Sequence, residues 1–242
     1  MNFFVIRHGQ TDYNAQRRFQ GQADIPLNDN GRDQARRAGL ILQTLLTQSD
    51  GKSARTHCFA SDLLRTQQTT EIVLPHIQDC QVDLILEPRL REFHCGLFEN
   101  RTYEEFVCAH QEIADAYMTA YEKDRYGTRY PGLGGESRED VMKRVGEVLL
   151  QTHQLIQNGT NVLWVAHGGV IDVLLELMHI QLPKAGADRI SAGNGDVLQF
   201  SLGEGTAILS VVSEKLGHSA HWHLNKHYKI GNTVAAKVIK DL

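Results

Sequence analysis

The stretch Phe3-Phe4-Val5-Ile6-Arg7-His8-Gly9 places a histidine directly after a short apolar run. Residues 2–6 are too few for an amphipathic helix and are followed by a polar segment, so they predict a buried strand. Ligands of open α/β sheets bind in the crevice outside the carboxyl ends of the strands. Arg7 and His8 lie at such an end and are candidates for a ligand site, although an Arg-His pair alone is more often part of an ordinary surface turn.

Strands and helices alternate along the rest of the chain. Short apolar or β-branched runs predict strands at residues 56–60, 82–86 and 161–166. Apolar residues at helical spacing predict helices from Asn28 or Asp29 to about residue 48, from a cap at Ser61 to about Val73, from a cap formed by Ser137 and Asp140, and after His167. Residues 197–202 and 207–213 predict a β-hairpin. This order favours an α/β fold, a three-layer sandwich with a mostly parallel central sheet flanked by helices, in one domain spanning residues 1–242.

The segment from about residue 100 to residue 134 interrupts this alternation. Residues 101–122 predict a helix, and its buried stripe is predicted to be Phe106, Ile113, Ala114 and Tyr117. The whole segment is too small to bury a core of its own, so we expect a helical, cap-like insertion that covers one face of the sheet. Residues 11–28 are polar and predict a functional loop over the end of the first strand.

Composition narrows the classes of partner. The chain has 242 residues with 25 basic and 29 acidic side chains, hence a net charge of −4. This balance argues against nucleic acid or an anionic membrane as the main partner. No apolar stretch approaches the roughly 18 residues that cross a bilayer, so we expect a cytoplasmic protein. The cysteines lack metal-ligand spacing and are expected to be reduced thiols; they are Cys58, Cys80, Cys95 and Cys108.

Three predicted strand ends carry cationic or imidazole side chains. Arg7 and His8 follow the first strand, Arg65 follows residues 56–60, and His167 follows residues 161–166. Parallel strands end at the same edge of a sheet, so we expect these side chains to converge. Two guanidinium groups beside two imidazoles suit a tetrahedral dianion, which predicts a site that handles phosphate.

The same residues resemble the histidine phosphatase superfamily, in its phosphoglycerate-mutase-like branch. The similarity follows an ordered set of motifs along most of the chain: Arg7-His8-Gly9 with Thr11 and Asn14, Gly21-Gln22-Ala23-Asp24, Ser61-Asp62-Leu63 with Arg65 and Thr69, Arg91-Glu92 with Gly96, Gly135-Glu136-Ser137, Ala166-His167-Gly168-Gly169, and Asn194-Gly195. Each motif alone is weak, but the ordered set is specific. The chain departs from the pattern at Ile171-Asp172, because many relatives carry an arginine there.

The resemblance implies a mechanism that needs neither a metal nor a cofactor. His8 would be the nucleophile that forms a phosphohistidine. Arg7, Arg65 and His167 would neutralise the charge on the phosphoryl oxygens. Glu92 would protonate the leaving alkoxide and then take a proton from the attacking water. The further substrate contacts implied by the resemblance are Asn14, Gln20, Gly21 and Asn194.

Within this family the site can hydrolyse a phosphomonoester or move a phosphoryl group between two hydroxyls of one substrate. Residues 93–99, which follow Glu92, resemble the phosphatases more than the mutases. We therefore predict a phosphatase for a small phosphorylated metabolite, with phosphoglycerate-mutase-type transfer as one alternative and non-catalytic binding of a phosphorylated ligand as another. The acid phosphatase branch is disfavoured because glycine, and not aspartate, follows His167. The substrate, and the choice between monomer and homo-oligomer, stay open.

Two further motifs have simpler interpretations. Residues 134–137, Gly-Gly-Glu-Ser, lack the lysine of a nucleotide-binding phosphate loop, so capping a helix is the favoured role. Four histidines and Trp222 lie in residues 218–227, but their irregular spacing and the lack of carboxylates favour a polar loop over a metal site.

Overall fold

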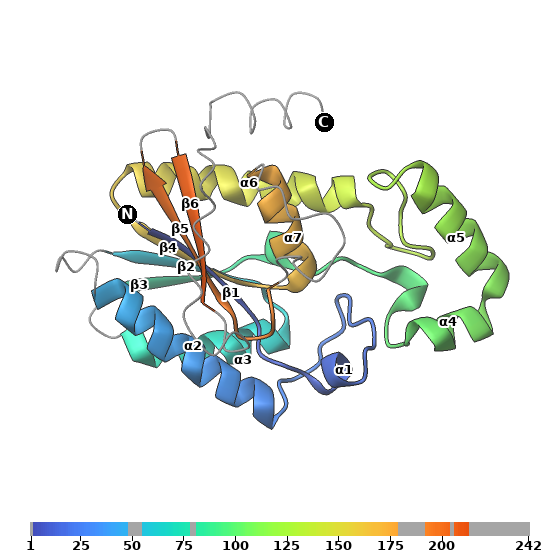
Figure 1. Cartoon of the computed structure of the whole chain (residues 1–242), viewed down its shortest axis with the longest axis horizontal. Helices are drawn as coiled ribbons and strands as arrows, with labels where there is room; N and C mark the ends of the chain where they lie inside the picture. The colour runs from blue at the N-terminus through green and yellow to red at the C-terminus, as the bar shows by residue number, and fades with distance from the viewer. Residues whose placement is uncertain (1, 48–54, 78–80, 179–191, 204–205, 213–242) are drawn as a thin grey trace.

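The computed structural model describes residues 2–47, 55–77, 81–178, 192–203 and 206–212 (Figure 1). The strands are β1 (Asn2–Arg7), β2 (Thr56–Ala60), β3 (Val82–Leu86), β4 (Asn161–Ala166), β5 (Val197–Gly203) and β6 (Thr206–Val212). The α-helices are α1 (Asp12–Ala15), α2 (Asp29–Thr47), α3 (Leu64–Val73), α4 (Tyr103–Ala109), α5 (Gln111–Lys123), α6 (Arg138–Gln157) and α7 (Gly168–Leu177). Short 3-10 helices lie at Leu74–Ile77, Pro88–Leu90 and Gly96–Phe98. The predicted alternation of strands and helices is confirmed.

One six-stranded sheet forms the centre, with the strand order β3-β2-β4-β1-β5-β6. β3, β2, β4 and β1 are parallel, whereas β5 runs antiparallel to β1 and β6 antiparallel to β5. The mostly parallel sheet and the hairpin are therefore confirmed. Arg7, the last residue of β1, pairs with Ala166, the last residue of β4. His8 and His167 consequently leave the sheet at the same edge.

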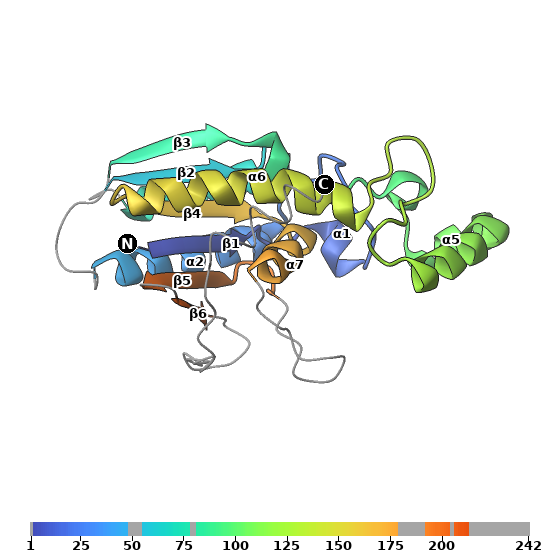
Figure 2. The same ribbon diagram turned by 90° about the horizontal axis from the view of Figure 1, so that it is seen from above.

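Helices cover both faces of the sheet. α6 and α7 lie on one face, and α2 and α3 lie on the other (Figures 1 and 2). The alternation of side chains along β1 shows why both faces are apolar. Phe3 and Val5 belong to the core beneath α6 and α7, whereas Phe4 and Ile6 belong to the core beneath α2 and α3. This arrangement is the predicted three-layer sandwich.

The local sequence predicts the start of α6 correctly but not the start of α3. Ser137 and Asp140 form the predicted capping box at the start of α6. The predicted cap at Ser61 is wrong, because α3 begins later and its N-cap residue is Leu63, which makes no side-chain cap hydrogen bond. Ser61 instead lies buried at the end of β2, where a different partner binds its hydroxyl.

Residues 11–28 contain more regular structure than predicted. Thr11 and Asn14 form a capping box around the short helix α1, so the segment is not a continuous loop. Of the two predicted caps of α2, Asn28 is the one used, since its side chain accepts a hydrogen bond from the N–H of Gly31 at 2.9 Å.

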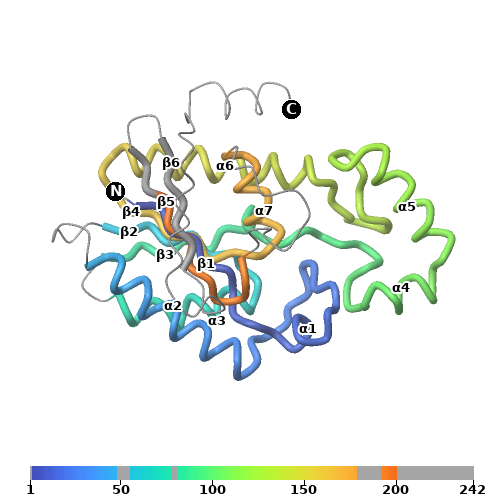
Figure 3. The backbone as a smooth tube through the Cα atoms, in the orientation of Figure 1, coloured from blue at the N-terminus to red at the C-terminus, as the bar shows by residue number. Residues whose placement is uncertain are grey.

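Helices α4 and α5 lie beyond the carboxyl ends of the strands (Figures 1, 2 and 3). The prediction that this insertion covers a face of the sheet is therefore wrong. The helix predicted over residues 101–122 is also divided, because His110, with φ −145° and ψ 47°, ends α4 and precedes α5. Phe106 and Ala114 are buried as predicted, whereas Ile113 is 39% exposed. Helical periodicity shows which face of a helix is apolar, but not which neighbour covers it.

A small apolar cluster holds this cap together. Phe98 stacks on Phe106 with 3.8 Å between the ring centroids, and Cys95 and Ala114 complete the buried set. Cys95 and Phe98 come from the segment before the insertion, only a few residues after Glu92. The cap is thus packed directly onto the segment that carries the predicted acid.

Among the described residues, no helix is both long enough and apolar enough to span a membrane. Cys80 and residues 218–227 lie outside the described residues, so the interpretation of the histidine-bearing segment as a polar loop stays a prediction. A cytoplasmic location and a single domain over residues 1–242 also stay predictions.

Candidate active site

His8 directly follows β1 and is only 2% exposed. Its Nδ1 lies 2.7 Å from the carbonyl oxygen of Gly9. A carbonyl can only accept, so Nδ1 carries the proton and Nε2 keeps its lone pair. Burial, followed by the positive charges of Arg65 and Arg7, holds the pKa of His8 well below its usual value. At neutral pH, His8 is therefore a neutral imidazole with one nitrogen able to attack an electrophile.

Gly9 allows close packing directly after His8. A Cβ atom at this position would lie 2.2 Å from the carbonyl oxygen of Gly31 in α2, so only glycine fits without a backbone shift. The N–H of Gly9 donates to the hydroxyl of Thr69 in α3 at 3.1 Å. The backbone that carries the imidazole is thus held between α2 and α3.

Arg65 lies in the first turn of α3, as predicted, and is fully buried. Its Nη1 donates to the carbonyl oxygen of Ala23 and its Nη2 to that of Gly21, each at 2.8 Å. Burial lowers the pKa of Arg65 to about 10, which still leaves the guanidinium charged at neutral pH. The segment that follows α1 therefore holds a permanent positive charge beside His8.

His167 follows β4 and is fully buried. The centroid of its ring lies 5.1 Å from that of His8. Its Nε2 lies 2.9 Å from the hydroxyl of Ser61, and that hydroxyl accepts a longer hydrogen bond from the N–H of Leu63. Ser61 can therefore donate its own proton to Nε2, which puts the imidazole proton on Nδ1. Burial, together with Arg65 and His8, holds the pKa of His167 well below its usual value.

Three buried nitrogen atoms at this edge have no hydrogen-bond partner among the described residues: Nε of Arg7, Nε of Arg65 and Nδ1 of His167. The first of these side chains is anchored elsewhere, since Nη1 of Arg7 donates to the carbonyl oxygen of Ala192 at 2.6 Å. A buried donor without a partner costs about 1–3 kcal/mol. The oxygens of a tetrahedral anion are acceptors of the kind these nitrogens need, which favours the predicted phosphate pocket.

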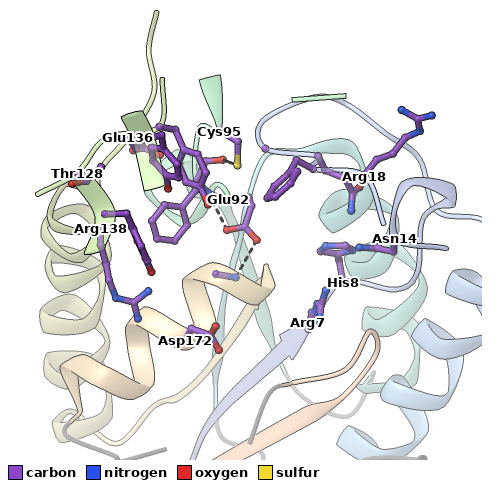
Figure 4. Close-up of a pocket in the computed structure, with 18 of the residues that line it drawn as sticks. Arg7, His8, Asn14, Arg18, Glu92, Cys95, Thr128, Glu136, Arg138 and Asp172 are labelled. Carbon is purple, nitrogen blue, oxygen red and sulfur yellow. Dashed lines mark hydrogen bonds between the residues drawn. The ribbon is translucent and has the colours of Figure 1, made fainter. Parts of the chain in front are cut away.

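Glu92 lies across the pocket from His8 (Figure 4). Its Oε1 accepts from the N–H of Phe93 at 2.9 Å, and its Oε2 accepts from the N–H of Gly169 at 3.0 Å. A Cβ atom at position 169 would lie 2.4 Å from Oε1, so the second glycine after His167 makes room for this carboxylate. The structure brings Glu92 into the same pocket as His8, at the start of α7.

The predicted substrate contacts occupy two different places. Asn14, Gln20 and Gly21 line the pocket. Oδ1 of Asn14 accepts from the amide of Asn194 at 3.2 Å, so the NH₂ group of Asn14 is the part that can donate to a ligand. Asn194 does not line the pocket; its amide donates to the carbonyl oxygen of His8 at 3.0 Å. Asn194 therefore supports the residues that face a ligand.

The pocket extends from His8 and Arg65 toward the cap, with a cavity volume of about 400 Å³. The lining toward the cap includes the aromatic and cationic residues Phe19, Phe93, Tyr117, Tyr121, Tyr130, Arg18, Arg125 and Arg138, together with Thr128, Glu136 and Asp172. Arg18 pairs with Glu105 at 2.7 Å and Arg138 with Glu176 at 2.6 Å, so two of these cations are already neutralised. The lining toward the cap offers aromatic surface to the part of a ligand that lies beyond its phosphoryl group.

Sequence reasoning missed several residues of this site. The sequence predicts a helix start at Ser61 and only a packing role for Tyr117, and it gives no role to Tyr121. Glu136 lines the pocket although its motif suggested only a cap. The ordered motifs contained Ser61, Thr69 and Glu136, so their presence was a signal, but spacing alone does not show which partners they contact.

No group of three His, Cys, Asp or Glu residues able to hold a metal ion occurs in the described part of the chain. The expectation that no metal is needed stays a prediction. The site nevertheless supplies from Arg7 and Arg65 the positive charge that metal ions supply in many phosphoryl-transfer sites.

Comparison with known proteins identifies the class. The sequence profile of the histidine phosphatase superfamily (branch 1) matches residues 3–215, and the chain belongs to this superfamily. It is 31% identical over 222 residues to a protein of Enterobacter sp. (strain 638) named probable phosphoglycerate mutase GpmB, a match that covers 91% of this chain and 94% of that protein. A protein of the same name from Photorhabdus laumondii is 33% identical over 175 residues, or 72% and 73% of the two chains.

Solved structures of similar fold include phosphatases. The mycobacterial glucosyl-3-phosphoglycerate phosphatase in complex with VO3 is 28% identical, with a TM-score of 0.60, and the match covers 83% of this chain and 92% of that chain. Its native structure is 26% identical with a TM-score of 0.64, and covers 87% and 96%. The predicted family and fold class are therefore confirmed.

Proposed function

We propose that this protein is a phosphatase that hydrolyses a phosphomonoester of a small metabolite through a phosphohistidine on His8. One observation carries the proposal: the lone pair of Nε2 lies at the same sheet edge as three buried nitrogens, on Arg7, Arg65 and His167, that have no hydrogen-bond partner in the part of the chain that the structure describes. In-line attack on a phosphoryl group needs a nucleophile beside donors for the equatorial oxygens. This arrangement meets both needs.

The reaction proceeds in two steps. Nε2 of His8 attacks phosphorus while the bond from phosphorus to the leaving oxygen breaks, and Glu92 gives its proton to that oxygen. Water then attacks phosphorus, the bond from phosphorus to Nε2 breaks, and Glu92 takes the proton from the water. Inorganic phosphate leaves, and both side chains return to their starting states.

Asp172 favours hydrolysis over a phosphoglycerate-mutase reaction. It lines the pocket on α7, and its negative charge acts on Arg7 (Figure 4). A mutase for phosphoglycerates must hold a substrate that carries a carboxylate, and the negative charge of Asp172 would repel that group. The names of the curated relatives keep the mutase reaction as the competing activity.

Three assays on one preparation test this proposal. Wild-type protein should release inorganic phosphate from p-nitrophenyl phosphate, and His8→Ala should reduce that release to background. Phosphoglycerates, tested with and without a bisphosphate primer, should lose phosphate faster than they isomerise. Faster isomerisation would establish the mutase, and no turnover of any phosphomonoester by wild-type protein would favour a non-catalytic binding protein.

A further inference from the structure

Arg144 of α6 uses every N–H of its guanidinium group within the protein; there are five such donors. Nε donates to Oε1 of Glu136 at 2.8 Å and Nη2 to Oε2 at 3.0 Å. Nη1 donates to the carbonyl oxygens of Arg89 at 2.7 Å and Arg91 at 2.6 Å, and Nη2 also donates to that of Glu92 at 3.2 Å. The side chain is only 16% exposed and is held in one position.

Glu136 extends this contact to the other side of Glu92. Its Oε2 accepts from the N–H of His94 at 2.8 Å, and its own N–H donates to the carbonyl oxygen of His94 at 3.0 Å. The side-chain amide of Gln22 donates to the carbonyl oxygen of Glu92 at 3.2 Å. The backbone before, at and after Glu92 is therefore held by Arg144 and Glu136, with Gln22 as a third contact.

These contacts matter because no side chain among the described residues donates a hydrogen bond to the carboxylate of Glu92. Its oxygens accept from the backbone N–H groups of Phe93 and Gly169. Gly169 belongs to α7, whereas Glu92 lies on the segment that leaves β3. The position of the carboxylate thus depends on how firmly that segment is fixed against the helices on this face of the sheet, and Arg144 on α6 makes that connection.

We propose that Arg144, with Glu136, is a positioning residue for the proton donor Glu92. This inference rests on the acid role proposed for Glu92. It also gives the motif Gly135-Glu136-Ser137 a function beyond capping. Ser137 caps α6, while Glu136, one residue earlier, binds a side chain two turns further along the same helix.

The proposal predicts a selective defect. An alkyl phosphate needs a proton on its leaving oxygen, whereas the p-nitrophenolate of p-nitrophenyl phosphate leaves without one. Displacing a catalytic group by about 1 Å can reduce a rate about 100-fold. We expect Arg144→Met to lower kcat/KM for glycerol phosphate about 30- to 100-fold and that for p-nitrophenyl phosphate less than about fivefold. The KM for glycerol phosphate should change far less than kcat.

Matched variants distinguish a positioning role of Arg144 from a general loss of folding or stability. Arg129 also pairs with an acidic residue of α6, Asp140, but its side chain is 61% exposed, and within the described part of the chain its hydrogen bonds go to Gly135 and Asp140 and not to residues 89–92. Arg129→Met should keep the wild-type ratio of the two activities. Arg144→Lys, which keeps the charge but cannot make five hydrogen bonds, should show an intermediate ratio, and the thermal midpoint of each variant is measured alongside.

A double mutant tests whether Arg144 acts through Glu92. In a Glu92→Gln background, adding Arg144→Met should lower glycerol phosphate turnover by less than about threefold, because the proton donor is already absent. Guanidinium ion added to Arg144→Ala should restore turnover of glycerol phosphate in a saturable way. It should restore nothing when Glu92→Gln is also present.

Three results would overturn the inference. Equal loss on both substrates in folded Arg144→Met, or full additivity with Glu92→Gln, would show that Arg144 does not act through the acid, although the acid role of Glu92 would stand. Equal loss on both substrates in Glu92→Gln itself would remove the acid role and this inference with it.

Discussion

The hydroxyl oxygen of Ser61 lies 2.9 Å from Nε2 of His167, although the two residues are 106 positions apart in the sequence. This contact joins the ends of the neighbouring strands β2 and β4. It also determines which nitrogen of His167 carries the proton, and leaves Nδ1 as the nitrogen that can donate to a ligand. In the proposed mechanism, the hydroxyl therefore orients one of the groups that would stabilise the transition state.

Ser61→Ala should lower kcat for p-nitrophenyl phosphate about 10-fold, because an imidazole without its partner loses both its orientation and its preferred tautomer. Steady-state kinetics measures this loss. Thr44→Ala is the control, since that hydroxyl is exposed and donates to the carbonyl oxygen of Leu40 within α2. Unchanged kcat in Ser61→Ala would remove the hydroxyl from the mechanism.

The two buried histidines predict that the ligand-free protein loses stability in acid. In the folded state their pKa values lie well below 6.5, whereas in the unfolded chain they lie near 6.5. Below that pH the unfolded state binds more protons, so the free energy of unfolding falls as the pH falls toward the folded pKa values. Each histidine contributes up to about 1.4 kcal/mol per pH unit in this range.

Urea unfolding at pH 7.5 and pH 5.5 measures this effect in wild type and in His8→Asn. The difference in free energy of unfolding between the two pH values should be smaller in the variant, because one depressed imidazole is gone. An equal difference in both proteins would contradict the assignment of His8 as a neutral, desolvated imidazole.

Substitution of glycine by alanine should have opposite effects on the stability of the fold at positions 9 and 146. Gly9→Ala should destabilise the fold by about 2 kcal/mol or more and abolish activity, because the new Cβ would lie 2.2 Å from a backbone oxygen of α2. In Gly146→Ala, inside α6, the new Cβ would meet Leu177 at 4.0 Å and no nearer atom of the described residues, so this change should stabilise the fold by about 0.5–1 kcal/mol. Thermal and urea unfolding of both variants check this, and a stable, active Gly9→Ala would be inconsistent with the packing described.

The charge of Asp172 should select against substrates that carry a carboxylate. Asp172→Asn should raise turnover of 3-phosphoglycerate relative to glycerol phosphate about 10-fold, because one repulsive charge is removed from the pocket wall. Asp115→Asn, on the exposed side of α5, is the control. A ratio that is unchanged in Asp172→Asn would show that Asp172 does not select against carboxylated substrates.

Residues at strand ends were predictable because two local signals coincide there. The apolar runs before His8 and His167 identify buried strands, and parallel pairing brings the ends of such strands to one edge. Arg65 was placed for the same reason, since a helix follows β2 almost at once. The convergence of Arg7, His8, Arg65 and His167 could therefore be predicted from two facts: where the strands end, and that the strands run parallel.

Contacts between distant segments were not predictable in this way. Serine is a common helix-capping residue, so the local sequence around Ser61 favours a cap. Only the pairing of β2 with β4 shows that the Ser61 hydroxyl contacts His167. The five acceptors of Arg144 include three carbonyl oxygens more than 50 residues away, which no sequence pattern marks. The position of α4 and α5 depends on Phe98 and Cys95, and helical periodicity does not predict that these two residues pack on the cap.

The central claim is that phosphorus becomes bonded to Nε2 of His8 during turnover. Wild-type protein mixed with a ³²P-labelled phosphomonoester and quenched in alkali within milliseconds should carry label that is stable in base and lost in acid, and peptide mass spectrometry should place it on His8. His8→Ala should carry none. Label on another residue, or rapid turnover without any labelled protein, would contradict the mechanism.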